Sequence, residues 1–113
     1  MKQLLLFILI AGVISGCGKS NNADDSAPVA SFKITNTVEE GVIIESTTLQ
    51  IQNNSRNADS YEWDFGDGIV SSDRTPAGIV YRQCPIIREI RLTVRTRTGR
   101  THTIVQTIRV RCR

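Results

Sequence analysis

The segment from Tyr61 to Gly68, which reads YEWDFGDG, constrains the fold of this chain more than any other feature. The aromatic residues Tyr61, Trp63 and Phe65 alternate with two acidic residues. Successive side chains of an extended strand point to opposite faces, so the alternation predicts three buried rings on one side and two solvated carboxylates on the other. The Asp67-Gly68 step tolerates the positive φ of a tight hairpin turn, which predicts a chain reversal into residues 69–71.

Apolar residues also alternate along most of residues 28–113, and this pattern predicts an all-β fold. No stretch reads as a long amphipathic helix, because β-branched residues and threonine dominate from residue 43 onward. The length fits one domain, and no internal repeat is visible. The residues expected in the core are Ala30, Phe32, Ile34, Leu49, Ile51, Tyr61, Trp63, Phe65, Ile79, Tyr81, Ile90, Leu92, Val94, Ile104, Ile108 and Val110.

The string YEWDFGDG resembles the signature of the PKD domain, a small immunoglobulin-like β-sandwich. Residues 28–32 resemble the opening strand of that family, and residues 49–55 are similar to its second strand and the polar corner after it. Residues 90–94 and 108–110 resemble its last two strands. The resemblance implies a sandwich of two antiparallel sheets over residues 28–112. Its signature positions here are Tyr61, Trp63, Asp64, Phe65, Gly66, Asp67 and Gly68.

The first residues do not belong to that fold. Lys2 provides a positive charge, residues 4–14 are apolar or small, and small residues precede Cys17. A helix over residues 4–14 would rise only about 16 Å, against ~30 Å for a bilayer core, which excludes a permanent transmembrane helix. The ending resembles a bacterial lipobox, in which Cys17 becomes the lipidated first residue of the mature protein. The alternative is an ordinary cleaved secretory signal.

We therefore expect a lipoprotein signal peptide over residues 1–16, a linker with lipidated Cys17 over residues 17–27, and a PKD-like domain over residues 28–113. Several acyl chains would anchor the protein stably to a membrane. The linker is polar throughout and would span about 17 Å as a flexible coil. We expect a lipid-anchored protein of the cell envelope, and Gly18 favours the outer membrane because an aspartate there is the inner-membrane retention signal of enteric bacteria. Which face of that membrane carries the domain stays open.

The cysteines fit an exported protein. Lipidation of Cys17 leaves Cys84 and Cys112 as an even pair outside the cytosol, where disulfides persist. Strands on either side of residues 98–100 would form a hairpin that brings the two cysteines together, so we expect them to be bonded. PKD domains usually have a Pro-Gly turn and a tyrosine where this chain has residues 85–88, and we hypothesise that the disulfide replaces that anchor.

Charge is divided unevenly along the chain. Residues 82–113 carry nine arginines and one glutamate, whereas residues 17–81 carry four basic and ten acidic residues. The strand phase predicts an outward-facing set consisting of Arg91, Arg95, Arg97, Arg109 and Arg111. Guanidinium groups suit carboxylate and phosphate, so this set is a candidate site for an anionic glycan, a lipid headgroup or an acidic protein. The alternative is a solvated surface that balances the acidic part of the same domain.

No residue set points to catalysis or to a cofactor. His102 is the single histidine and has no assignable nucleophile, and with two cysteines it offers too few ligands for zinc. Asp64 and Asp67 lack the spacing of a calcium-binding EF-hand loop, and the predicted turn explains both. Nucleic acid is a poor partner, because the chain carries an export signal and no aromatic residues interleave with the arginines.

The resemblance to PKD domains implies a non-catalytic binding or adhesion module that contacts polysaccharide or protein. The alternative is a structural accessory subunit of an outer-membrane or cell-surface complex. We expect no enzymatic activity, no cofactor and no metal.

Overall fold

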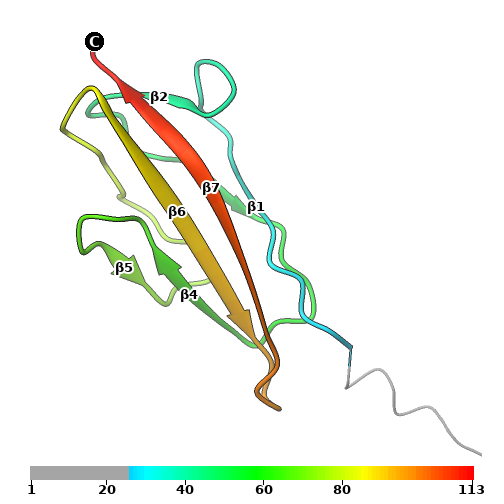
Figure 1. Cartoon of the computed structure of the whole chain (residues 1–113). Helices are drawn as coiled ribbons and strands as arrows, with labels where there is room; N and C mark the ends of the chain where they lie inside the picture. Colours follow the sequence, from blue (N-terminus) through cyan, green and yellow to red (C-terminus); the bar gives the residue numbers. More distant parts are fainter. Residues whose placement is uncertain (1–25) are drawn as a thin grey trace, which may run out of the picture.

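The computed structural model describes residues 26–113, and this part of the chain is all-β (Figure 1). The predicted signal peptide and most of the predicted linker, including Cys17, lie outside the described residues. Within residues 26–113 there is no helix with the length and hydropathy needed to span a bilayer. The strands are β1 Phe32–Ile34, β2 Val42–Ile44, β3 Ile51–Asn53, β4 Ser60–Asp64, β5 Val70–Ser71, β6 Ile86–Arg95 and β7 Thr101–Arg111.

The strands form the two sheets of a sandwich. Strands β1 and β3 pair in a two-stranded sheet, and the other sheet has five strands in the order β2-β7-β6-β4-β5. Every pairing is antiparallel except that of β2 with β7, which is parallel. The sequence predicted purely antiparallel sheets and no strand at residues 42–44. The parallel strand was missed because it is a short apolar run without alternation, and it pairs with a strand distant in sequence.

The signature segment folds as its pattern predicts. Strand β4 ends at Asp64, and β5 returns antiparallel beside it. The turn between them is closed by the Ile69 N–H, which donates to the Gly66 carbonyl at 3.0 Å. Its central residues Asp67 and Gly68 have φ of 56° and 78°, the left-handed backbone that a tight hairpin requires.

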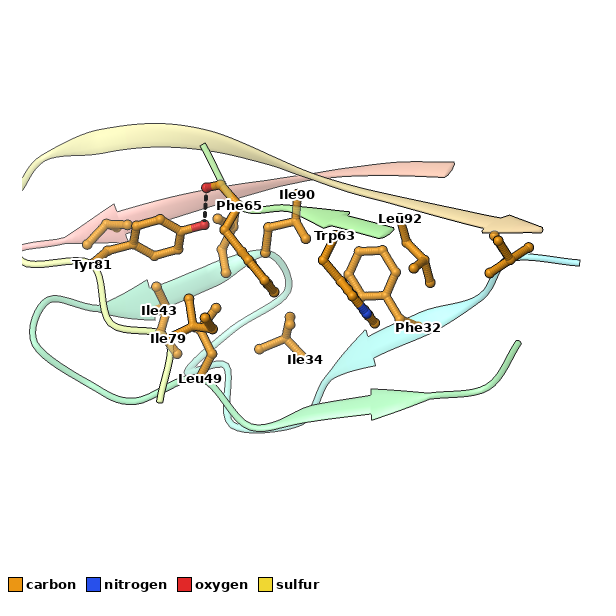
Figure 2. Close-up of a cluster of buried hydrophobic side chains, with 14 residues drawn as sticks. Phe32, Ile34, Ile43, Leu49, Trp63, Phe65, Ile79, Tyr81, Ile90 and Leu92 are labelled. Atoms are coloured by element: carbon orange, nitrogen blue, oxygen red, sulfur yellow. Dashed lines mark hydrogen bonds between the residues drawn. The ribbon is translucent and has the colours of Figure 1, made fainter. Parts of the chain in front are cut away.

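The core lies between the two sheets and centres on Trp63 (Figure 2). The Trp63 ring is fully buried, contacts Phe32 edge-on at a centroid distance of 5.1 Å and stacks parallel to Phe65 at 5.6 Å. Its indole N–H donates to the Asp73 carbonyl at 2.9 Å. The predicted core is confirmed except that Ile51, Tyr61 and Ile104 are only half-buried. The sequence also missed the buried residues Val42 and Ile43 of β2.

Tyr81 lies in the loop between β5 and β6 and is hydrogen-bonded to the residue that follows β4. Its hydroxyl donates to the Phe65 carbonyl at 2.5 Å (Figure 2). Burial, with a smaller effect of the Asp67 charge, raises the pKa of the Tyr81 hydroxyl to about 12. Ile79 and Tyr81 are buried as expected, and the segment that holds them pairs through a single bridge between Val80 and Thr48.

The long β6–β7 hairpin runs the length of the domain (Figure 1). Cys84 and Cys112 form a disulfide at its open end, with their Cα atoms 5.2 Å apart, as the hairpin geometry predicted. The turn at the other end lies beside Ser26, where the described chain begins. The C-terminus and the start of the described chain therefore lie at opposite ends of the domain (Figure 1).

Candidate functional site

The five-stranded sheet has an outer face, the side directed away from β1 and β3. In β6, Ile90, Leu92 and Val94 are fully buried, so the residues between them point outward. The same phase applies to β7, where Ile108 and Val110 are buried. The outer face of β6 and β7 is therefore formed by Ile87, Glu89, Arg91, Thr93, Arg95, Thr101, Thr103, Val105, Thr107, Arg109 and Arg111.

Four of the five predicted arginines lie on this face, but they are spread along it. Arg95 is opposite Thr101, whereas Arg109 is opposite Ile87 at the other end of the hairpin. Arg91 and the partner of Arg109 are four positions apart in β6, which separates the two arginines by about 13 Å along the strands. Arg97 is not on the face, because it lies in the turn beyond β6. Its main-chain N–H donates to an Asp59 carboxylate oxygen at 2.9 Å.

The arginines of the outer face differ in their partners. Arg95 pairs with Glu62 at 3.7 Å, and Arg111 pairs with Glu39 at 3.4 Å. These side chains are at least half exposed, and such surface pairs typically contribute little to stability. Arg91 and Arg109 form no ion pair with any residue in the described range. Their guanidinium groups are therefore available to a ligand.

A hollow of ≈ 610 Å³ surrounds Arg91 on this face. It is lined by the Glu62 and Asp64 carboxylates of β4, by Ser71 and Ser72, and by Arg91 and Thr93 of β6. Val70 forms an apolar part of its wall and is 68% exposed. The Arg91 hollow thus combines hydrogen-bond donors, acceptors and a small apolar surface, and it is more polar than a typical pocket for an apolar ligand.

A second hollow of ≈ 450 Å³ surrounds Arg109 near the disulfide end of the face. Its lining includes Arg111, Thr107 and the exposed Ile87. The Arg109 hollow is also bordered by Glu39 and Glu40. The outer face therefore offers two cationic positions, each set among carboxylates and hydroxyls, rather than one concentrated anion site.

The other candidate residues have structural partners. Asp64 accepts a hydrogen bond from the Gly66 N–H at 2.9 Å, and Asp67 is ion-paired with Arg88 at 2.9 Å. His102 Nδ1 accepts from the Ala30 N–H at 2.8 Å. These contacts give the two aspartates and the histidine a role in the fold.

One group of three possible metal ligands occurs in the described part of the chain, formed by Glu45, Cys84 and Cys112. Metals bind cysteine as the thiolate, and the disulfide uses both sulfur atoms. The carboxylate of Glu45 also accepts a hydrogen bond from the Arg113 N–H at 3.0 Å. The group therefore does not have the chemistry of a metal site.

Sequence reasoning singled out the arginines of this face and overlooked its apolar residues. Val70, Ile87 and Val105 are 68%, 57% and 44% exposed, and all three lie on the outer face. Their signal was present in the sequence, because Ile87 and Val105 fall out of phase with the buried residues of their strands. The three residues are separated from one another by polar side chains, so they add single apolar contacts to a polar face and do not form one apolar patch.

Comparisons with known proteins agree with this architecture. The family model described as PKD domain matches residues 25–112. The PKD1 domain of the Vibrio cholerae metalloprotease PrtV is 31% identical, with a TM-score of 0.59, and the match covers 76% of this chain and 99% of that one. The PKD1 domain of Vibrio anguillarum Epp is 28% identical, with a TM-score of 0.61, covering 78% of this chain and 98% of that one.

A third solved structure comes from work on the promiscuous specificity of carbohydrate-binding modules of the β-sandwich superfamily. It is 25% identical, with a TM-score of 0.65, and the match covers 77% of this chain and 35% of that one. No curated protein matches the chain.

Proposed function

The chain belongs to the PKD domain family, and from this premise we propose that it is a non-catalytic binding module of the cell envelope. In this proposal a lipid at Cys17 holds the domain at a membrane, the outer membrane being favoured, and the domain contacts polysaccharide or an envelope protein. The observation that carries it is the outer face of the five-stranded sheet, where Arg91 and Arg109 line two hollows and form no ion pair with residues 26–113.

In this proposal the guanidinium of Arg91 binds a carboxylate of the polysaccharide, and because Glu62 and Asp64 in the same hollow repel negative charge, the polymer would carry its carboxylates sparsely among neutral sugars. A guanidinium binds a carboxylate through two parallel hydrogen bonds, and the serine, threonine and acidic groups around it can bond sugar hydroxyls. The likeness to part of a structure solved in work on carbohydrate-binding modules supports this direction. The exposed side chains of Val70, Ile87 and Val105 offer apolar contact beside the polar groups.

The alternative function is that of a structural accessory subunit in an outer-membrane or cell-surface complex. The observation in its favour is the same set of exposed apolar residues, because arginine combined with apolar side chains is common at protein interfaces. Stable co-purification with one envelope protein, without binding to polysaccharides, would favour this alternative.

The proposal is tested by measuring binding of residues 26–113 to neutral and carboxylated polysaccharides in low and moderate salt. The PKD1 domain of PrtV has a crystal structure of its own and the match covers 99% of it, so we expect residues 26–113 to fold alone as well. We expect binding to the carboxylated polymers that weakens steeply with salt, since exposed charges are screened beyond about 8 to 10 Å at physiological ionic strength.

The variant Arg91→Glu should abolish this binding and change stability by no more than about 0.5 kcal/mol, as is typical of surface substitutions. The matched control is Arg56→Glu, which makes the same charge change next to the other sheet and should bind normally. Equal loss in both variants would show that only net charge matters, and absence of binding at low salt would refute the polysaccharide proposal.

A further inference from the structure

Strand β7 has an open edge along most of its length. Its antiparallel ladder with β6 covers residues 101–110, but β2 covers only residues 109–111 on the other side. Backbone groups of an antiparallel strand point alternately to its two neighbours. The Arg109 N–H points toward β2, since it donates to the Gly41 carbonyl at 2.8 Å. The main-chain groups of Thr101, Thr103, Val105 and Thr107 therefore point the same way, and none is hydrogen-bonded within the described range.

The neighbour on that side is β1, and it does not pair with the β7 backbone (Figure 1). It is connected to β7 through side chains instead. The Gln106 amide donates to the Phe32 carbonyl at 2.7 Å, and His102 accepts from Ala30. A gap of ≈ 250 Å³ lies between the two strands, bordered by Phe32, Ile34 and Thr107. The open edge is thus accompanied by a partly apolar recess.

The sequence of this edge lacks the features that usually prevent edge pairing. Residues 101–107 read THTIVQT, with no lysine, arginine, acidic residue, proline or glycine. Natural proteins normally protect a long edge with charge, proline or a bulge. Segments of high β-propensity and low charge are those that pair with another strand most readily. Arginines flank the segment at positions 100 and 109 but do not interrupt it.

We propose that this edge is a self-association site, at which β7 pairs antiparallel with β7 of a second copy of the chain. The inference goes beyond the proposed ligand binding, because it uses the sheet edge rather than the outer face. The segment 101–107 is complementary to a second copy of itself. A two-fold axis at Ile104 places Thr101 opposite Thr107 of the second copy and Thr103 opposite Val105. The Thr107 carbonyl lies against Gly41, and most of the other free main-chain groups of the segment then gain partners, which gives about six inter-chain hydrogen bonds.

The side chains are compatible with this register. Thr103 and Val105 are β-branched residues that pack well as a cross-strand pair, and no like charges oppose each other between residues 101 and 107. The half-buried Ile104 meets its own copy at the axis. The result would be a continuous sheet across both domains, a symmetric interface of the kind commonest in homodimers.

The test is sedimentation equilibrium of residues 26–113 up to millimolar concentration, with three variants. The wild-type domain should show a reversible monomer–dimer equilibrium. The pair Thr103→Lys with Val105→Lys should abolish the dimer, since it sets lysines opposite lysines. The pair Thr103→Lys with Val105→Glu should restore it, since each lysine then faces a glutamate. Val70→Ser, on the outer face but away from β7, should leave it unchanged.

Several results would overturn the proposal. A wild-type domain that stays monomeric at every concentration would do so, as would a dimer that persists in the lysine pair. Loss of the dimer in Val70→Ser would assign the contact to the outer face instead. Failure of the lysine–glutamate pair to restore the dimer, with its circular dichroism spectrum unchanged, would refute the register. Polysaccharide binding is measured on the wild-type domain at concentrations where it is monomeric, so the outcome for the dimer and the outcome for the proposed function are obtained separately.

Discussion

Trp63 is the residue whose burial contributes most to this small core. Its ring is fully buried between Phe32 and Phe65, and its N–H is hydrogen-bonded. We expect Trp63→Ala to cost about 3 to 5 kcal/mol, a large part of the ~5 to 15 kcal/mol typical of a whole domain. Urea denaturation followed by circular dichroism measures this. Tyr61→Ala, which truncates a half-buried ring on the same strand, should cost less, and a Trp63→Ala domain as stable as the parent would contradict the core described here.

Tyr81 makes stability depend on pH in the alkaline range. Its pKa is 10.0 in the unfolded chain and about 12 in the fold, so the fold favours the protonated hydroxyl. The stabilisation is complete below pH 10 and is lost as pH rises through 12, because the unfolded state releases its proton first. At neutral pH, Tyr81→Phe should destabilise the domain by about 1 to 3 kcal/mol, since it leaves the buried Phe65 carbonyl without its donor.

The difference between Tyr81→Phe and wild type should therefore shrink between pH 10 and pH 12. Thermal unfolding at a series of pH values checks this. Two stability curves that stay parallel up to pH 12 would show that the buried hydroxyl is not linked to folding.

At the scale of elements, the β6–β7 hairpin and its disulfide form the longest pairing in the domain. The bond closes a loop between residues 28 positions apart, which in the chain-entropy model stabilises the fold by about 3.5 kcal/mol. Cys84→Ser combined with Cys112→Ser should therefore lower the melting temperature clearly. Reduction of the wild-type domain should give the same loss and leave the double variant unaffected. An unchanged melting temperature in the double variant would refute the idea that the disulfide replaces the missing family anchor.

The elements that the sequence predicted well are those defined by local pattern. Alternation identified β4, β6 and β7, and the Asp67-Gly68 step identified the turn after β4. Strand β2 could not be read in this way, because its pairing with β7 joins residues that are far apart in sequence. The open edge of β7 was not predicted either, because whether a strand edge is paired depends on the whole sheet and not on the sequence of one strand.

The candidate site was also predicted only where local strand pattern determines it. Strand phase correctly placed Arg91, Arg95, Arg109 and Arg111 on one side of the hairpin. It extended the pattern to Arg97, although β6 ends at Arg95 and a residue in the turn no longer follows the alternation. The two hollows were not predictable, because they depend on side chains contributed by several strands.

For the whole molecule, the uneven charge of the sequence is partly balanced by folding. The ion pairs Arg88–Asp67, Arg95–Glu62 and Arg111–Glu39 each join the arginine-rich residues 82–113 to the acidic part before them. The alternative interpretation of the arginines as balancing charges therefore describes Arg95 and Arg111 well. It does not describe Arg91 and Arg109, which form no ion pair with the described residues, so the proposed ligand contacts rest on these two.

The position of residue 26 on the domain determines where the proposed lipid anchor would be attached. The described chain begins beside the turn at residues 96–98, so a membrane tether at Cys17 would be attached at this end of the domain, opposite the disulfide end. The outer face would then stand at the side of the domain, open to polymers or proteins in the envelope.

The proposed lipid anchor at Cys17 can be tested directly. The thiol of Cys17 is the group that a lipobox modifies, so Cys17→Ala should release the domain from the membrane fraction or leave an unprocessed precursor. Cell fractionation and the mass of the recovered protein measure this. The matched control is Cys84→Ser with Cys112→Ser, which removes the other two cysteines, leaves the lipobox intact and should remain with the membrane. Normal processing and membrane recovery of Cys17→Ala would rule out the lipoprotein, because an acyl anchor of this type cannot form without that thiol.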